Sequence, residues 1–221
     1  MIVPLTAQQT MALLGPGFVA TFQSEMDAIV APLRKHIALG RPLSMGKELW
    51  EYVVSDSIPG AVWNGAGHSL IDVMITPGVG ADVKSLSYGP QSKQTTEASM
   101  YQNFDQDAKQ FFINKDKQSL WNLYVNGWFA KAQSFKKYYL IGILREKATL
   151  DCNLCAFEVT DTVPMFSDTL CTFTGTMMNI LGITDQDFLK VRYYNSKSRM
   201  EILFHKKCWT DPIYTLPIYK F

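Results

Sequence analysis

The sequence predicts an α/β protein in which a central mixed β-sheet is flanked by helices. Segments with apolar residues at helical spacing are mixed along the chain with segments that alternate or are continuously apolar, as strands are. Hydrophobic residues make up 47% and charged residues 19% of the 221-residue chain, which is typical of a globular protein with a sizeable core. Neither an internal repeat nor a low-complexity stretch divides the sequence, so we expect one domain over residues 1–221.

Two helices are expected in the first quarter of the chain. Residues 17–39 carry large apolar side chains on one side at helical spacing, at Phe18, Phe22, Met26 and Ile29. Pro32 breaks or kinks this helix because its ring clashes with the preceding turn. A second helix is expected over residues 46–54, and it stops before the Ser57–Gly60 turn.

A hairpin and more helical sequence are expected next. Residues 69–75 and 81–87 have strand character and are joined by a turn that contains Pro77 and Gly78. From about residue 97 to residue 134 the apolar spacing is helical.

The remaining third of the chain mixes strands and helices. Residues 138–144 form a continuous apolar run that suits a buried strand, and residues 154–160 alternate like another strand. We expect a helix over 165–181 and a short helix that Asp185 caps. The stretch 191–209 indicates a hairpin around Asn195–Ser198.

Three charged side chains of the first hairpin are expected to meet. In a strand, residues at even separations share a face, so Asp82 and Lys84 point the same way, and Asp72 differs from both by an even number. In an antiparallel pair, a residue-number sum of 154 sets Asp72 opposite Asp82, and a sum of 156 sets it opposite Lys84. Either register brings all three side chains within about 5–8 Å.

Two carboxylates at that separation repel each other unless a positive charge lies between them. Hard carboxylate oxygens favour Mg²⁺, with Mn²⁺ as a substitute. Such a metal would neutralise charge on a phosphodiester and lower the pKa of a bound water, while Lys84 would orient that water or stabilise the transition state. The alternative is a polar hairpin face on which Asp72 and Lys84 form a surface pair worth about 0–1 kcal/mol.

Asp72, a ten-residue step and then Asp82-x-Lys84 on paired strands after a helix resembles the PD-(D/E)xK nucleases, in particular type II restriction endonucleases. The resemblance implies a restriction-endonuclease-like fold with a catalytic core at about residues 46–160. It also implies Mg²⁺-dependent hydrolysis of double-stranded DNA at specific sites, as part of a restriction system, by a homodimer. The chain departs from the family pattern at Ile71, where the motif has proline.

The family often carries an auxiliary glutamate on the helix before the hairpin. Glu51 and Glu48 both lie on the expected helix, and we assign Glu51 with Glu48 as the alternative. Glu97 is a weaker candidate, because a glutamate at a helix N-terminus more often interacts with the helix dipole.

The cysteines raise a zinc alternative. Cys152, Cys155, His205 and Cys208 form two pairs with the spacing of zinc ligands. Cysteines three apart on one strand point to opposite faces, however, so we expect buried thiols rather than structural zinc.

Basic residues cluster at two places. Lys131, Lys136 and Lys137 surround a helix-to-strand junction. The C-terminal hairpin carries side chains that can contact DNA bases and phosphates, at Arg192, Asn195, Lys197 and Arg199. A solvated charged hairpin is the alternative for the second cluster.

Composition sets limits on partners and location. The net charge of +1 argues against a protein that merely coats nucleic acid, but it permits a local DNA-binding cleft. The sequence contains no run of 18 apolar residues and no signal-peptide pattern, so we expect a cytoplasmic protein with no membrane partner. The readings that remain are a DNA endonuclease, a non-catalytic DNA-binding protein and a zinc-stabilised interaction protein.

Overall fold

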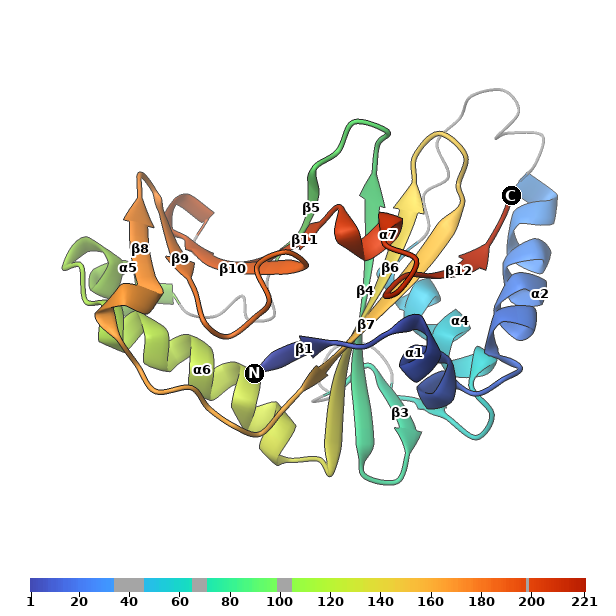
Figure 1. Ribbon diagram of the computed structural model, residues 1–221, viewed down its shortest axis with the longest axis horizontal. Helices are drawn as coiled ribbons and strands as arrows, with labels where there is room; N and C mark the ends of the chain where they lie inside the picture. The colour runs from blue at the N-terminus through green and yellow to red at the C-terminus, as the bar shows by residue number, and fades with distance from the viewer. Residues whose placement is uncertain (34–45, 65–70, 99–104, 198) are drawn as a thin grey trace.

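The computed structural model describes residues 1–33, 46–64, 71–98, 105–197 and 199–221, and these form two β-sheets with helices against them (Figure 1). The seven-stranded sheet has the order β1-β7-β6-β4-β3-β2, with β12 also paired to β7. Strands β4 and β6 run parallel and the other pairs are antiparallel, so the predicted mixed sheet is confirmed. Its strands are β1 (Ile2–Pro4), β2 (Val62–Trp63), β3 (Val73–Thr76), β4 (Val79–Tyr88), β6 (Lys137–Glu146), β7 (Cys152–Val159) and β12 (Leu216–Tyr219).

The second sheet has five strands in the order β5-β11-β10-β9-β8, and all its neighbours are antiparallel. Its strands are β5 (Gln94–Ala98), β8 (Cys171–Thr174), β9 (Met177–Ile180), β10 (Leu189–Tyr194) and β11 (Arg199–His205). Strand β4 of the first sheet is followed after a short turn by β5 of the second, so this connection links the two sheets.

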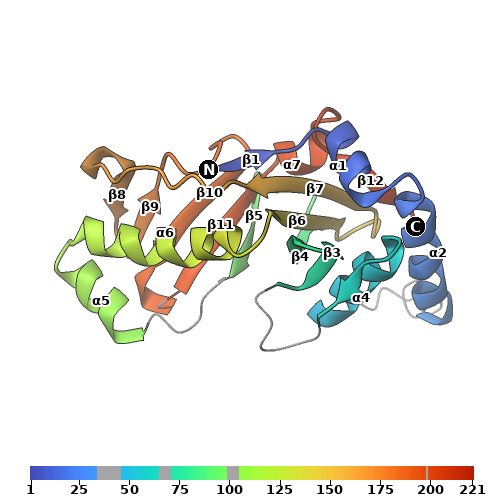
Figure 2. The same cartoon turned by 90° about the horizontal axis from the view of Figure 1, so that it is seen from below.

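Helices separate into two groups. The helices α1 (Ala7–Leu14), α2 (Phe18–Val30) and α4 (Lys47–Ser57) share a core with one face of the first sheet. The helices α5 (Asp105–Ile113) and α6 (Lys117–Gln133) lie against the second sheet, as Figure 2 shows, and share a core with the other face of the first sheet. Short helical turns complete the chain at η1 (Ala31–Leu33), η2 (Asp168–Leu170), η3 (Asn195–Lys197) and α7 (Lys207–Thr210).

Strand β4 is buried between these two cores, and its alternation decides which side chains face which helices. Ala81 and Val83 belong to the core with α1, α2 and α4. Leu86 and Tyr88 belong to the core with α5 and α6. Asp82 and Lys84 share the parity of Leu86, so their side chains point toward the side of the sheet on which α6 lies.

The N-terminal helices follow their sequence signals. Thr6 and Gln9 form a capping box that begins α1. Along α2 the predicted positions Phe18, Phe22 and Met26 are buried, whereas Ile29 is only half-buried. The helix ends at Val30, and a single 3₁₀ turn that contains Pro32 follows. The predicted break of the helix at this proline is therefore confirmed, and the predicted positions 34–39 lie outside the described residues.

Three helix predictions are wrong. The predicted helix that begins near residue 97 starts instead at Asp105, because residues 94–98 pair as β5 with the outer edge of β11. The predicted helix over 165–181 is the β8–β9 hairpin, whose turn contains Gly175 at a φ of +56°. Asp185 caps no helix: its carbonyl accepts from Phe188 and Leu189 in a turn that leads into β10.

Candidate functional site

The β3–β4 hairpin fixes the register on which the site depends. Val73 pairs with Ala81 and Met74 with Gly80, which is the register with a residue-number sum of 154. Gly78 occupies the turn at a φ of +83°, a conformation that favours glycine. Asp72 precedes β3, and its N–H donates to the carbonyl of Ala81 at 3.1 Å. The hairpin therefore brings Asp72 alongside Asp82, as the first of the two predicted registers requires.

Asp72 and Lys84 form an ion pair at this hairpin. The Asp72 Oδ2 atom accepts a hydrogen bond from the backbone N–H of Val83 at 2.8 Å and lies 3.4 Å from Lys84 Nζ. The Lys84 side chain is 6% exposed and the Asp72 side chain 20% exposed. This ammonium group is therefore almost buried, and the carboxylate beside it remains open to solvent on one side.

Asp82 is held by a residue whose role the sequence did not reveal. Its Oδ2 atom lies 3.0 Å from Nζ of Lys131 on α6, and the Asp82 side chain is 4% exposed. Lys131 appeared only as one member of a basic cluster. No sequence pattern linked Lys131 to Asp82, because the two residues lie 49 positions apart in the chain.

The two pairs make a compact and electrically balanced group, with two carboxylates and two ammonium groups. In each carboxylate the ion pair uses Oδ2, and among the described residues no donor contacts either Oδ1. Each aspartate therefore keeps an oxygen that can bind a further positive group. A lysine is a compact point charge on a flexible stem, so it can also move when another cation approaches.

The two candidates for the auxiliary carboxylate differ in how deeply they are buried. Glu51 is 3% exposed on α4, a helix that contacts β2, β3 and β4, whereas Glu48 is exposed in its first turn. Glu51 is therefore a buried carboxylate beside the strands, on a helix that packs against the face of Ala81 and Val83. Glu97 lies on β5 of the second sheet and not at a helix N-terminus, so its predicted setting is wrong.

The donor set suits Mg²⁺. Within the described part of the chain there is no group of three or more His, Cys, Asp and Glu side chains that could hold a metal ion. Mg²⁺ does not need such a cage, because it keeps several waters and is commonly bound by one or two carboxylates together with substrate phosphates. The free oxygens of Asp72 and Asp82 meet that requirement.

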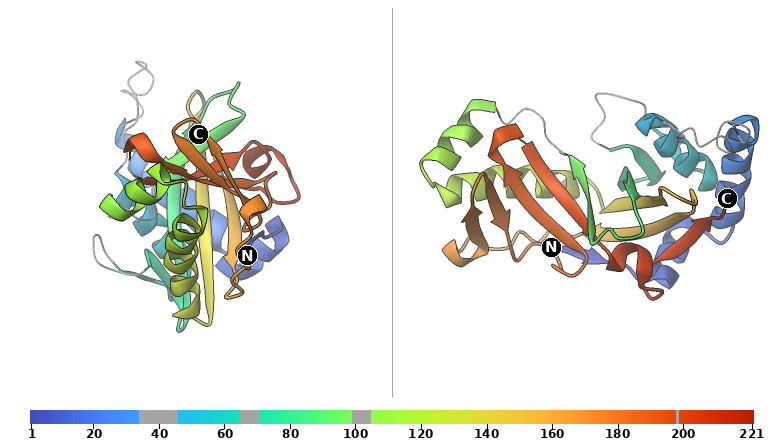
Figure 3. Two further views of the ribbon diagram at one scale, coloured as in Figure 1. Left: turned by 90° about the vertical axis from the view of Figure 1, so that its left-hand side faces the viewer. Right: turned by 90° about the horizontal axis from the view of Figure 1, so that it is seen from above.

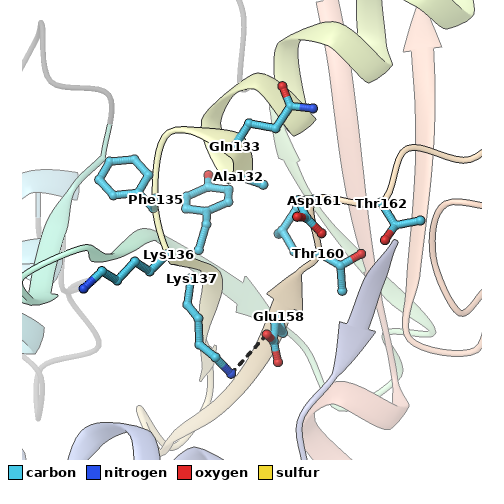
Figure 4. Close-up of a pocket in the computed structure, with 11 residues that line it drawn as sticks. Ala132, Gln133, Phe135, Lys136, Lys137, Glu158, Thr160, Asp161 and Thr162 are labelled. Atoms are coloured by element: carbon cyan, nitrogen blue, oxygen red, sulfur yellow. Dashed lines mark ion pairs between the residues drawn. The ribbon is translucent and has the colours of Figure 1, made fainter.

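A pocket of about 410 Å³ opens where α6 ends and β6 begins (Figure 4). Its lining includes Tyr138, which pairs with Gly80, two residues before Asp82 on β4. Tyr138 therefore shares the sheet face of Asp82. Lys137 forms a 3.3 Å ion pair with Glu158 at its rim, so the pocket carries both signs of charge. The pocket therefore lies at the end of the sheet, where Tyr138 comes from the face of Asp82 and Lys137 and Glu158 come from the opposite face.

The four candidate zinc ligands do not converge. Cys152 lies in the core with α1, α2 and α4, and Cys155 lies in the core on the other face of the sheet, next to Cys208. All four cysteines of the chain are buried free thiols, as we expected for Cys152, Cys155 and Cys208. Burial raises the pKa of Cys152 to about 12, so this thiol stays protonated at neutral pH.

The predicted DNA-contacting residues lie elsewhere, on the β10–β11 hairpin. Arg192 and Arg199 both bind Glu201, and Asn195 lies in the turn between the strands. The side chain of Lys197 is outside the described residues. This hairpin shares its core with α5 and α6 through the opposite face, so its arginines do not line the Asp82 site.

Comparisons of this chain with protein-family models, with curated proteins and with solved structures give no match. In the described part of the chain, no helix is long and apolar enough to cross a membrane. The case for function therefore depends on the geometry of the site.

Proposed function

We propose that this protein is a Mg²⁺-dependent, sequence-specific endonuclease of double-stranded DNA, similar to the type II restriction enzymes. The observation that carries the proposal is the placement of Asp72, Asp82 and Lys84 on one face of one hairpin. A buried lysine beside two carboxylates, on a strand between two apolar cores, costs free energy unless it is paired or used in chemistry.

Each of the three residues has a distinct role in the proposed reaction. Asp72 and Asp82 would hold the metal through their free oxygens. The metal, when bound, supplies positive charge to the scissile phosphate and lowers the pKa of a water. Lys84 Nζ, which is held by Asp72, orients the attacking water and stabilises the charge that develops on the phosphate. Glu51 is the auxiliary carboxylate in this proposal.

The same proposal names the partners. Cleavage of both strands at a symmetric site requires one active site for each strand, so we expect a homodimer. A restriction-type enzyme acts on DNA in the cytoplasm, and the proposal places the protein there.

The test is cleavage of mixed-sequence duplex DNA by the purified protein with Mg²⁺, with EDTA as the metal-free control. Lys84→Ala and Asp82→Asn are each expected to lower the rate by about 10²-fold or more, because each removes charge stabilisation in the transition state. Lys220→Ala is the matched control, because it removes an exposed lysine near α2 and should cleave as wild type does. Thermal unfolding of each variant checks that the fold is retained.

Two results would contradict the proposal in different ways. Mg²⁺-dependent cleavage that survives both site substitutions would place the chemistry at other residues. Failure of the wild-type protein to cleave any of a broad set of DNAs would favour the second candidate, a non-catalytic DNA-binding protein. The balanced ion pairs support that candidate, because each carboxylate already has a cationic partner without a metal.

A further inference from the structure

The second sheet has one face toward α5 and α6 and one face directed away from them. Buried residues of the first face, such as Val191 and Ile202, belong to the core that also contains α5 and α6. Their neighbours along the strands must point to the opposite face. Viewed from above, the strands of this sheet lie on the near side of α5 and α6 (Figure 3).

The opposite face carries a continuous row of polar side chains. Directly paired residues share a face, and the registers place Thr172, Asn179, Arg192 and Glu201 side by side across β8, β9, β10 and β11. Lys190 lies two residues before Arg192 and therefore points the same way. We call this surface, composed of Thr172, Asn179, Lys190, Arg192, Arg199 and Glu201, the outer face.

Two arginines of the outer face are fixed by one buried carboxylate. Glu201 is 2% exposed, and its Oε2 accepts from Arg192 Nε at 2.7 Å, while its Oε1 accepts from Arg199 Nη2 at 2.8 Å. Both arginines bind through Nε and Nη2, and within the described residues Nη1 of each has no hydrogen-bond partner. The guanidinium groups are therefore held in place with donors still available.

A pocket of about 180 Å³ lies beside these arginines on the outer face. It is lined by Thr172, Asn179, Gln186 and Lys190, together with Leu181 and Val191. Lys190 is exposed and has no hydrogen bond or ion pair with any described residue. The polar side chains of this lining are neutral or positive, which suits an anion.

The charges of the outer face favour an anionic polymer. Its three cations and one carboxylate leave two positive charges. Asp187 at the margin is bound by Lys207 at 2.6 Å and also interacts electrostatically with Lys190. The cations lie on β10 and β11, and the pocket extends to β9 and β8, so the surface is wider than one phosphate group. Arg192 also lies over the ring of Tyr194, 5.6 Å from its centroid.

We propose that the outer face binds the phosphodiester backbone of DNA, at a site separate from Asp72, Asp82 and Lys84. The arginine Nη1 atoms and Lys190 contact phosphates, and the pocket accepts one of them. The inference does not depend on catalysis. If the proposed endonuclease activity is correct, the outer face holds a different segment of DNA from the one that is cut.

The test is fluorescence anisotropy with labelled duplex and single-stranded DNA, in EDTA so that cleavage does not interfere. Lys190→Glu is expected to weaken binding about tenfold and to lower the slope of log affinity against log salt by about one. Asn179→Asp, which places a negative charge in the pocket without changing size, is expected to act in the same direction. Neither substitution removes a hydrogen bond or ion pair between described residues, so both variants should fold.

Lys220→Glu is the matched charge reversal at the far end of the molecule, and it should bind DNA as wild type does. Equal affinity and salt slope in Lys190→Glu, Asn179→Asp and Lys220→Glu would overturn the proposal. Full displacement of DNA by low concentrations of inorganic phosphate or of poly-glutamate would also overturn it, because a site for DNA should bind these anions more weakly than it binds DNA. If the protein binds DNA through Lys190 but does not cleave it, the proposed DNA-binding role of the outer face is supported and only the proposed endonuclease activity is refuted.

Discussion

The protein has two charged clusters made from the same classes of side chain but held in different ways. At the β3–β4 hairpin each carboxylate is paired with one lysine, at 3.4 Å and 3.0 Å, and keeps a free oxygen. On the second sheet one carboxylate is bound on both oxygens by two arginines. A carboxylate that is paired with a lysine can exchange that partner for another cation, whereas both oxygens of Glu201 are already bound by Arg192 and Arg199. The first cluster therefore has carboxylate oxygens open to a further partner, and in the second cluster both oxygens of the carboxylate are occupied.

Neutralising Glu201 has the largest expected effect. Glu201→Gln is expected to lower the free energy of unfolding by about 3 kcal/mol, because both arginines lose a buried charge partner but keep some contact with water. Chemical denaturation measures the change. Glu158→Gln is the matched control: its pair with Lys137 is more exposed and should be worth less than about 1 kcal/mol. Equal losses in the two variants would show that Glu201 is no structural clamp.

Lys131 is expected to compete with a metal ion for Asp82. Lys131→Met is expected to raise Mn²⁺ affinity about tenfold, because the ammonium group no longer occupies Asp82 or repels the cation. Isothermal titration calorimetry without DNA measures this directly. Lys136→Met, an exposed lysine near the same helix end, should leave affinity unchanged. Unchanged or weaker binding in Lys131→Met would exclude competition.

The smallest expected effect concerns pH at the edge of the outer face. Burial, with a contribution from Lys190, lowers the pKa of His205 below 6.5, and Asp187 opposes this only in part. As pH falls below about 6.5, the unfolded chain takes up this proton before the folded protein does. Stability is therefore lost as pH drops through the lowered pKa. Between pH 7 and pH 5 the melting temperature of wild type should fall further than that of His205→Gln; parallel curves would contradict this.

Much of the site could be predicted from the sequence because strand parity is robust. Once two strands flank Pro77 and Gly78, an even separation places Asp72, Asp82 and Lys84 on one face in either register. The Lys131 pair could not be derived in this way. It depends on how α6 lies across β4, and that packing joins residues that are 49 positions apart in the chain.

The errors in the fold have the same origin. Apolar residues at 170, 173, 177 and 180 are spaced as in a helix, but threonines and Gly175 between them favour a hairpin, which pairing with β10 stabilises. Residues 94–98 have almost no apolar side chains, so no periodicity marks β5. This strand forms through backbone pairing with β11, about a hundred residues later in the chain.

The strand β7 is paired along one edge by two segments from distant parts of the chain, β1 at Phe157–Val159 and β12 at Cys152–Leu154. During synthesis on the ribosome β1 is made long before β7, but β12 follows only after the β10–β11 hairpin has emerged. The half of β7 that awaits β12 remains an open template for other strands during that interval. Chaperones that shield nascent chains should therefore matter most for this protein after residue 159 has been translated and before residue 216 has.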